Sequence, residues 1–370
     1  MSATSFIIDQ IERGRAPDWV VRAGIRRLCR RRLRSEARLA AARQVSPAAA
    51  FVERMNDGPI APVPEKANEQ HYEAPAEFFS LVLGRHMKYS GCFWPAGVDD
   101  LSVAEAESLA MVCQRAELGD GMDILELGCG WGSLTLWMAE HYPSSTIVAV
   151  SNSASQRRHI MRQASERGLD NVQVITADMN DFDIDRRFDR IVSVEMFEHM
   201  RNYRELLGRI ADWLRPDGKL FVHIFCHRSV PYAFEARNDA DWMSQHFFTG
   251  GIMPSFDLLP CFDADFKVAR DWWIDGTHYR NTAEAWLRNM DRCRPEVLRI
   301  MADVYGPAEA GRWLQRWRIF FMACAELFGL RHGREWGVGH YLLEPKGASL
   351  MPRSERGNER RRDEPARAAS

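Results

Sequence analysis

A regular alternation of two kinds of segment between residues 121 and 225 places the strongest constraint on the fold. Short runs rich in β-branched residues alternate with amphipathic stretches, and the runs read MDILELG, STIVAVS, VQVITAD, FDRIVSVE and GKLFVHIF. Strands that alternate with helices are joined by right-handed crossovers, which produce a largely parallel sheet with both faces covered. The sequence therefore predicts an α/β protein built on a doubly wound sheet.

The composition excludes several classes of protein. The 370 residues carry 49 basic and 51 acidic side chains, whereas a dedicated nucleic-acid binder would usually show a clear basic excess. The eight cysteines include no CxxC pair, which argues against a zinc site or a disulfide framework. The N-terminal residues show no signal peptide, and the longest apolar run, 319–330, is interrupted by Glu326. We therefore expect a soluble, cytoplasmic protein with no metal and no nucleic-acid partner.

The regions outside the alternating part differ in composition. Residues 1–45 read as helix, and nine arginines against one acid, Glu36, stand between Val21 and Arg43. This basic segment is either a solvated helical face or a surface that approaches anionic lipid or another acidic partner. The remaining expectations are a linker over 57–70, an aromatic and turn-rich segment over 228–262, strand-like runs at 266–274 and 336–344, helical material over 282–330, and a disordered tail.

The first predicted strand ends in a glycine-rich turn that opens a predicted helix over 133–141. Gly128, Gly130 and Gly132 permit positive φ and let a ligand approach the backbone, but their spacing is not the GxGxxG of dinucleotide folds. Glu126 stands before the turn, where its carboxylate could accept hydrogen bonds from a cationic ligand. S-adenosylmethionine (SAM) carries an ammonium and a sulfonium and no phosphate, so it fits this turn better than a pyrophosphate does. The alternative is a tight turn without a ligand.

The next two predicted strands end in further candidate ligand-binding residues. The second ends in Ser151, Asn152 and Ser153 without an acid, so hydroxyl and amide groups, with Gln156 nearby, could replace the carboxylate that usually binds ribose. Asp178 follows the third strand, where it could face an adenine amino group. It could equally cap a helix.

A cluster of acidic residues and a histidine follows the fourth predicted strand. Glu195, Glu198 and His199 stand at the carboxyl edge of the sheet, where ligands of open α/β folds bind. If this segment is helical, Glu195 and His199 share a face at i and i+4. Two carboxylates and an imidazole can tune one another's pKa values toward neutrality, as a proton acceptor requires. His223, in the fifth strand, is either a catalyst or a satisfied core residue, and the two acids could be ordinary strand-end and helix-start residues.

Several longer segments carry a resemblance to a known family. His71-Tyr72-Glu73, Lys88-Tyr89-Ser90, LELGCGWG, VEMFEHM, FVHIF, HYRNTAEAW and FFMACAELFG resemble the cyclopropane-fatty-acyl-phospholipid synthase family of SAM-dependent methyltransferases. Within that family, FFTGGIMPS, FCH, DWM and PDWVVR are similar to the plant coclaurine N-methyltransferase group. The resemblance extends from about residue 15 to residue 346.

The resemblance implies a domain organisation and a cofactor site. It implies a Rossmann-like sheet of seven strands with the last one antiparallel, within a methyltransferase domain over 71–346. An N-terminal helical extension and linker would occupy 1–70, a helical lid insert about 228–262, and a disordered tail 347–370. The implied SAM contacts come from the strand-end residues already described and from three further positions. The full set is Tyr89, Ser90, Gly128, Gly130, Gly132, Ser151, Ser153, Gln156, Asp178 and Met179.

The resemblance also implies two sets of catalytic residues. In the lipid-cyclopropanating members a bicarbonate ion is held by a cysteine backbone, a glutamate, a histidine and a tyrosine. The matching positions are Gly91, Glu198, His223 and Tyr279, and Gly91 departs from the usual cysteine. In the N-methyltransferases the cluster of Glu195, Glu198 and His199 is expected to handle the substrate proton.

Two reactions therefore remain open from the sequence. The first is transfer of the SAM methyl group to the nitrogen of a small aromatic amine. The second is cyclopropane or methyl-branch formation on an unsaturated acyl chain, with bicarbonate as the base and with peripheral contact of the basic N-terminal helix with the inner membrane face. A SAM-binding protein without activity is a third alternative, and the oligomeric state is open, with a homodimer as one alternative.

Overall fold

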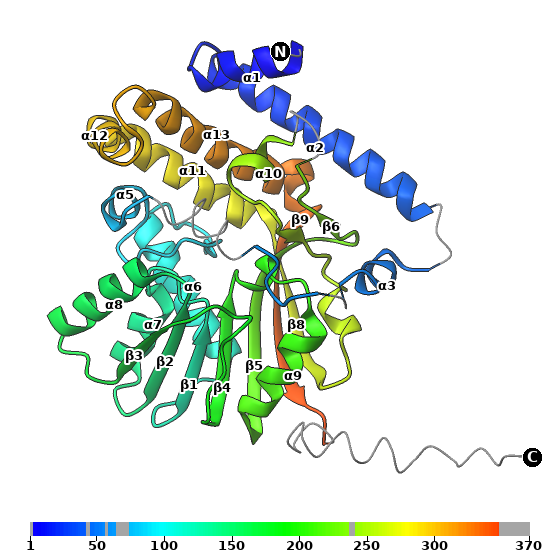
Figure 1. Ribbon diagram of the computed structural model, residues 1–370, viewed down its shortest axis with the longest axis vertical. Helices are drawn as coiled ribbons and strands as arrows, with labels where there is room; N and C mark the ends of the chain where they lie inside the picture. Colours follow the sequence, from blue (N-terminus) through cyan, green and yellow to red (C-terminus); the bar gives the residue numbers. More distant parts are fainter. Residues whose placement is uncertain (1–2, 42–44, 56–57, 64–73, 237–240, 348–370) are drawn as a thin grey trace, which may run out of the picture.

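Seven strands form one sheet in the order β3-β2-β1-β4-β5-β9-β8 (Figure 1). Strands β1 to β5 are parallel, and β9, the last strand of the chain, runs antiparallel to both of its neighbours. This arrangement confirms the predicted methyltransferase sheet. The strands are β1 Asp123–Leu127, β2 Thr146–Ser151, β3 Val172–Thr176, β4 Phe188–Val194, β5 Leu214–His227, β8 Phe266–Asp275 and β9 Trp336–Pro345.

The computed structural model describes residues 3–41, 45–55, 58–63, 74–236 and 241–347. The expected disordered tail, apart from Gly347, and most of the expected linker lie outside these described residues. Within the described ranges, no helix has the length and apolar character needed to span a membrane.

Helices cover both faces of the sheet because successive strand residues point to opposite sides. Ile124 packs with residues of α6 and α7, whereas its neighbour Leu125 packs with residues of α9. These helices are α6 Leu101–Arg115, α7 Ser133–His141, α8 Ala154–Glu166 and α9 Tyr203–Trp213. The bounds of α7 are those that the sequence predicts.

A second group of helices lies beyond the carboxyl ends of the parallel strands (Figure 1). Helices α11 Gly276–Arg292, α12 Arg294–Tyr305 and α13 Ala310–Phe328 pack on α5 Ala76–Val82 around a core of buried Trp and Phe side chains. The helical material begins six residues before the predicted 282, because the Asp275 carboxylate accepts the Thr277 N–H and caps α11 there.

The predicted N-terminal helix is two helices, α1 Ala3–Glu12 and α2 Asp18–Ala41, and both lie against α13 (Figure 1). Part of the arginine-rich segment is turned inward. The guanidinium of Arg22 pairs with Glu284 at 2.6 Å and with Glu326 at 3.1 Å, and Arg26 pairs with Glu326 at 2.9 Å. The basic helix is therefore both a solvated surface and a docked wall of the protein.

The expected helical lid contains little helix. The segment 228–262 holds the two-stranded sheet β6 Tyr232–Ala233 and β7 Ile252–Met253, the five-residue helix α10 Trp242–His246 and a 3-10 turn over Leu259–Cys261. Its glycines and aromatic residues favour turns and packing over a continuous helix.

Part of the expected linker is packed against the domain. Helix α3 Pro47–Val52 precedes the described residues 58–63, in which Ile60 and Ala61 are buried. The side chain of Asn180 accepts the N–H of Ala61 at 2.9 Å and donates to its carbonyl at 2.8 Å. This short segment therefore lies fixed beside the residues that follow β3.

Candidate active site

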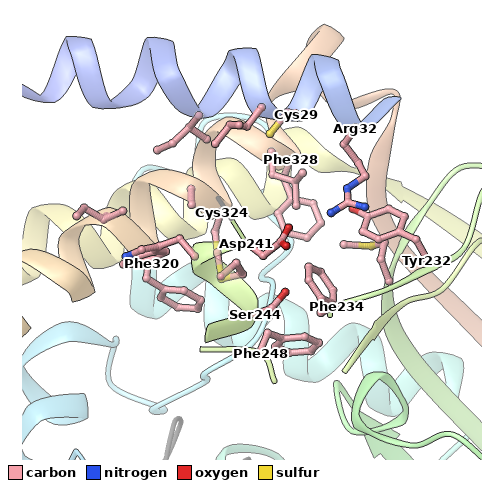
Figure 2. A pocket seen from close by; sticks show the side chains of 18 of the residues that line it. Cys29, Arg32, Tyr232, Phe234, Asp241, Ser244, Phe248, Phe320, Cys324 and Phe328 are labelled. Carbon is pink, nitrogen blue, oxygen red and sulfur yellow. The ribbon is translucent and has the colours of Figure 1, made fainter. Parts of the chain in front are cut away.

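Two cavities meet at the carboxyl end of β4. The large cavity, of about 1020 Å³, lies between α1 and α2 on one side and α10, α11 and α13 on another (Figure 2). The turn cavity is smaller and lies at the glycine turn after β1, where its lining includes Gly128, Gly130, Ser151, Gln156, Asp178 and Met179. Glu195 and His199 line both cavities. Any reaction between ligands of the two cavities would take place beside these two side chains.

The three glycines of the turn all have positive φ, and they serve different purposes. A Cβ at Gly128 would lie 2.7 Å from the Met196 side chain, and a Cβ at Gly132 would lie 2.6 Å from the side chain of Ile160. A Cβ at Gly130 would meet nothing within 4 Å. Gly128 and Gly132 therefore allow close packing, while Gly130 leaves open space on the cavity side of the turn.

The other residues of the turn cavity offer groups that suit a nucleoside. Ser151 Oγ donates to Gln156 Oε1 at 2.6 Å, and Gln156 is 1% exposed. Gln156 Nε2 has no hydrogen-bond partner among the described residues. A buried amide without an acceptor is costly, and a bound hydroxyl would satisfy it. Together with the open side of Gly130, this donor fits SAM.

Five of the predicted cofactor residues do not line the turn cavity. Ser153 caps α8, Gly132 is the N-cap residue of α7, and Ser90 Oγ accepts a hydrogen bond from the Lys88 ammonium at 2.7 Å. The carboxylate of Glu126, expected to face a cationic ligand, instead accepts the hydroxyl of Thr135 at 2.5 Å. Burial raises the pKa of Glu126 to about 7. We therefore assign this buried acid a structural role. Tyr89, the remaining predicted contact, lines the large cavity.

Glu195 does not share a helical face with His199, so that prediction is wrong. The 3-10 helix begins at Phe197, and Glu195 has φ +49°, in the left-handed region that non-glycine residues seldom adopt. The Glu195 N–H donates to the His223 carbonyl at 2.9 Å, which ties this residue to β5. The strained backbone turns the side chain away from the helix direction and toward the residues that precede α6.

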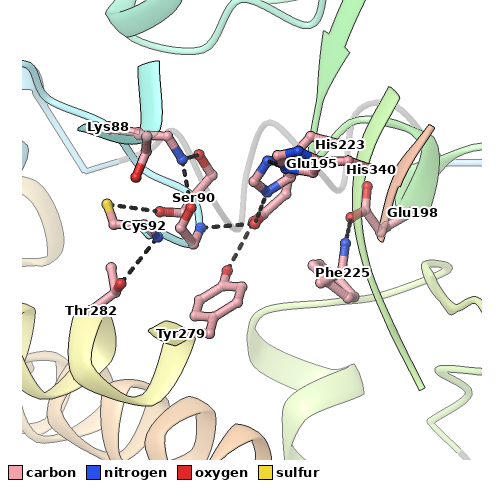
Figure 3. A network of polar contacts seen from close by, with 12 residues as sticks. Lys88, Ser90, Cys92, Glu195, Glu198, His223, Phe225, Tyr279, Thr282 and His340 are labelled. Carbon is pink, nitrogen blue, oxygen red and sulfur yellow. Dashed lines mark hydrogen bonds and ion pairs between the residues drawn. The ribbon is translucent and has the colours of Figure 1, made fainter. Parts of the chain in front are cut away.

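Three donors surround the carboxylate of Glu195 (Figure 3). Oε1 accepts the N–H of Gly91 at 2.8 Å and faces His223 Nε2 at 3.2 Å, while Oε2 accepts the hydroxyl of Tyr279 at 2.8 Å. Burial raises the pKa of Glu195, and the Lys88 charge with the Gly91 and Tyr279 hydrogen bonds acts in the opposite direction. The net result is a pKa of Glu195 above its ordinary value, while Gly91 and Tyr279 donate hydrogen bonds to its two carboxyl oxygens.

The residues expected to bind bicarbonate do not fit it. Gly91 N–H, His223 and Tyr279 all point to Glu195, so a carboxylate of the chain occupies the place where the anion would be held. Gly91 is needed at this position, since a Cβ there would lie 2.8 Å from the Tyr279 ring. The fourth expected residue, Glu198, is fully buried, accepts the Phe225 N–H at 2.6 Å and lines neither cavity.

The titratable groups at the junction differ in charge. Burial lowers the pKa of His199 to about 4, with the Glu195 charge opposing, so this imidazole is neutral near pH 7. Burial, followed by the charge of Glu195, raises the pKa of Glu198 well above its usual range. The junction thus combines the hydrogen-bonded side chain of Glu195 with a neutral His199, whereas Glu198, whose pKa lies well above its usual range, lines neither cavity. Within the described ranges, no group of three His, Cys, Asp or Glu side chains could hold a metal ion.

Several residues of the site were not singled out from the sequence. Lys88, which is 2% exposed, donates to the Gly91 carbonyl at 2.7 Å and faces Glu195. His340 on β9 contacts His223, and Asn180 fixes Ala61 at the turn cavity. Lys88 stands in a segment that carries the resemblance and could have been found there. The other two depend on pairing between distant segments, which a single sequence does not display.

The sheet with its antiparallel last strand, the open glycine turn and the ligand-binding residues beside it define a SAM-dependent methyltransferase. A family model described as mycolic acid cyclopropane synthetase matches residues 63–334. The chain is 33% identical over 344 residues to (S)-coclaurine N-methyltransferase of Thalictrum flavum subsp. glaucum, covering 92% of this chain and 95% of that protein. The chain belongs to the mycolic acid cyclopropane synthetase family.

Other relatives span both reactions of the family. The cyclopropane-fatty-acyl-phospholipid synthase of Escherichia coli K12 is 32% identical over 272 residues, which cover 73% of this chain and 66% of that protein. Among solved structures, coclaurine N-methyltransferase bound to N-methylheliamine and SAH has a TM-score of 0.88 at 32% identity and covers 93% of this chain and 100% of that one. The cyclopropane synthase MmaA2 of Mycobacterium tuberculosis has a TM-score of 0.65 at 22% identity, covers 77% of this chain and 99% of that one, and shares the fold.

Proposed function

We propose that the protein transfers the methyl group of SAM to the nitrogen of a small aromatic amine. The observation that carries the proposal is the carboxylate of Glu195 in the place where a bicarbonate ion would otherwise be held. A fixed carboxylate beside a neutral imidazole suits a cationic substrate that must lose a proton. The similarity to coclaurine N-methyltransferases over nearly the whole chain supports the same reaction.

The amine must be deprotonated before it can react. An alkyl amine with a pKa of about 10 is protonated in all but about one molecule in a thousand at pH 7, and its ammonium form has no lone pair. In this proposal Glu195 attracts the ammonium group and His199 takes the proton, since both line the junction of the two cavities. The adjacent Glu195 charge stabilises the imidazolium that forms, as the direction of its influence on His199 requires.

The large cavity suits an aromatic substrate. Aromatic rings lie around its inner end, where His199 lies 4.7 Å from the Phe248 ring and Tyr279 stacks on Phe328 at 4.0 Å, measured between ring centroids. Aromatic faces stabilise both flat rings and cations. A volume of about 1020 Å³ accommodates a molecule of several fused rings.

The cofactor would be held in the turn cavity. Gly128, Gly130, Ser151, Gln156, Asp178 and Met179 are the residues we assign to SAM. SAM, when bound, supplies an electrophilic methyl group. The protein's part is to hold the amine nitrogen at the junction, remove its proton and exclude water behind the N-terminal helices.

One observation favours a second candidate, reaction on an unsaturated acyl chain at a membrane surface in the cytoplasm. Gly24, Arg27, Leu28 and Arg31 of α2 line the large cavity, and Arg27, Leu28 and Arg31 are exposed, as are Arg30 and Arg34. A basic and partly apolar rim would suit an anionic lipid surface. In this candidate the same cavity would take an acyl chain.

Methyl-labelled SAM decides between the two candidates. Purified protein is incubated with an arylalkylamine mixture in one tube and with monounsaturated, anionic phospholipid vesicles in another. We expect label in the amine and none in the lipid. Label in the lipid alone would overturn the proposal, and a charge-neutralised Arg27, Arg30, Arg31 and Arg34 variant would then test the role of α2 in lipid contact.

A further inference from the structure

Four side chains from separate elements form a continuous line of polar contacts that ends at Glu195, and Figure 3 shows its last three members, His340, His223 and Glu195. Arg115 Nη1, at the end of α6, lies 2.9 Å from His340 Nδ1. His340 Nε2 lies 2.9 Å from His223 Nδ1, and His223 Nε2 lies 3.2 Å from Glu195 Oε1. His223 and His340 are paired in register on β5 and β9, so the sheet itself brings the two rings together.

The ends of this line determine the direction of every hydrogen bond in it. A guanidinium has only donors, so His340 must accept at Nδ1 and carry its proton on Nε2. A carboxylate has only acceptors, so His223 must also carry its proton on Nε2 and accept at Nδ1. Both ends require the same tautomer for each ring, and all donors point from the side of the sheet covered by α6 toward the active site.

We propose that His340 and Arg115 are positioning residues that hold His223 as an Nε2–H donor and thereby keep Glu195 as a correctly aimed anion. The role of Glu195 rests on the proposed function, whereas the tautomers of the two histidines do not. His340 is fully buried and His223 is 3% exposed, so no solvent molecule replaces a lost partner freely. Arg115 is held in place over the Trp272 ring at 5.0 Å.

The direction of these hydrogen bonds also excludes the line from Arg115 to Glu195 as a path for protons. Passing a proton from Glu195 to the outside would require every hydrogen bond in the line to reverse, and Arg115 would have to accept a proton that it has no lone pair to bind. In the proposed function the substrate proton passes instead to His199, which lines the large cavity. The charged and titratable groups that face the line are Lys88, Arg115, Glu195, His199 and Tyr279.

The first test compares two substitutions of the same histidine. In His340→Leu the side chain at position 340 can neither accept from Arg115 nor donate to His223. His223 is then no longer oriented by a partner, and Glu195 loses the support of an oriented His223. A hydrogen bond to a carboxylate favours its charged form, so its loss moves the acidic limb of the kcat/KM profile to higher pH. We expect kcat/KM for the amine at pH 7 to fall by about tenfold, with SAM affinity unchanged.

His340→Gln is the matched control. The Gln carbonyl can accept from Arg115 and its amide can donate to His223, so the direction of the line is kept. We expect it to recover most of the kcat/KM and the wild-type acidic limb. Arg115→Met, on the half-buried end of the line, should give a smaller shift in the same direction, while Arg190→Met, beside the same helix, should give none. A His340→Leu variant with the wild-type pH profile would overturn the inference.

A second measurement does not depend on turnover. Histidine-selective ¹⁵N labelling of the full chain reports the tautomer of each ring through its nitrogen chemical shifts. We expect both His223 and His340 as neutral rings protonated at Nε2. Protonation of either ring at Nδ1 would overturn the inference even in an active enzyme. If the wild type methylated no amine but both tautomers were as expected, the proposed function would fail and the hydrogen-bonded line would stand.

Discussion

The turn cavity and the large cavity are built in different ways. Most of the turn cavity comes from the ends of four neighbouring parallel strands and the residues just after them, between Gly128 and Met200. The large cavity draws on α1, α2, the insert, α11 and α13, which are far apart in the chain. One site depends on local backbone geometry and the other on the packing of side chains from distant segments. The proposed cofactor site therefore depends on fewer contacts between distant segments than the proposed substrate site does.

Gly130→Val should have the largest effect, and it acts on the turn cavity alone. The side chain would enter the open space beside the turn and would also strain a backbone with φ +52°. We expect SAM binding, measured by titration calorimetry, to be lost. Gly121→Val is the control, because Gly121 has φ +83° and open space but lies outside both cavities. Near-normal SAM binding by Gly130→Val would contradict the placement of the cofactor.

Glu195→Gln tests the junction of the two cavities and should come next in size. Removing the charge takes away the group that attracts the ammonium, so turnover of the amine should fall by about a hundredfold while SAM affinity is kept. Glu198→Gln is the matched control. Since burial raises the pKa of Glu198 well above its usual range and the side chain lines neither cavity, its replacement by a neutral amide should cost about tenfold or less. Equal losses in the two variants would contradict the different roles assigned to them.

Glu12→Gln should have the smallest effect, confined to the large cavity. Glu12 lines this cavity and joins three elements, since it accepts from Trp242 Nε1 at 2.8 Å and from Arg316 at 2.9 Å. Loosening α1 should raise KM for the amine about threefold and leave the SAM dissociation constant unchanged. Asp303→Asn, in an exposed ion pair with Arg299, should change neither value. A weaker SAM affinity in Glu12→Gln would show that the cavities are coupled.

The same contrast explains what the sequence could predict. The strands, the helix over 133–141 and the glycine turn follow from local patterns, and the predicted cofactor residues Gly130, Gln156 and Asp178 line one cavity. A strong hydrophobic periodicity allows the secondary structure of a segment to be predicted from its own residues.

The residues that the sequence could not place depend on contacts between distant segments or on an unusual backbone. The left-handed conformation of Glu195 breaks the helical spacing on which the predicted pairing with His199 relied. His340 reaches His223 only through the register of β5 with β9, and Glu126 turns inward to Thr135. The insert 228–262, for which the resemblance implied a helical lid, forms turns and a small sheet, in keeping with its glycines and aromatic residues.

The carboxylate that replaces a bound anion has a consequence for the conditions under which the protein can work. An enzyme that binds bicarbonate from solution depends on dissolved carbon dioxide. Its rate therefore changes with aeration and with the buffer. Glu195 is part of the chain and is held by Gly91, His223 and Tyr279 whatever the medium contains. Turnover is therefore expected to be the same in buffers purged of carbon dioxide and in buffers saturated with it, which makes this site independent of the gas supply of its surroundings.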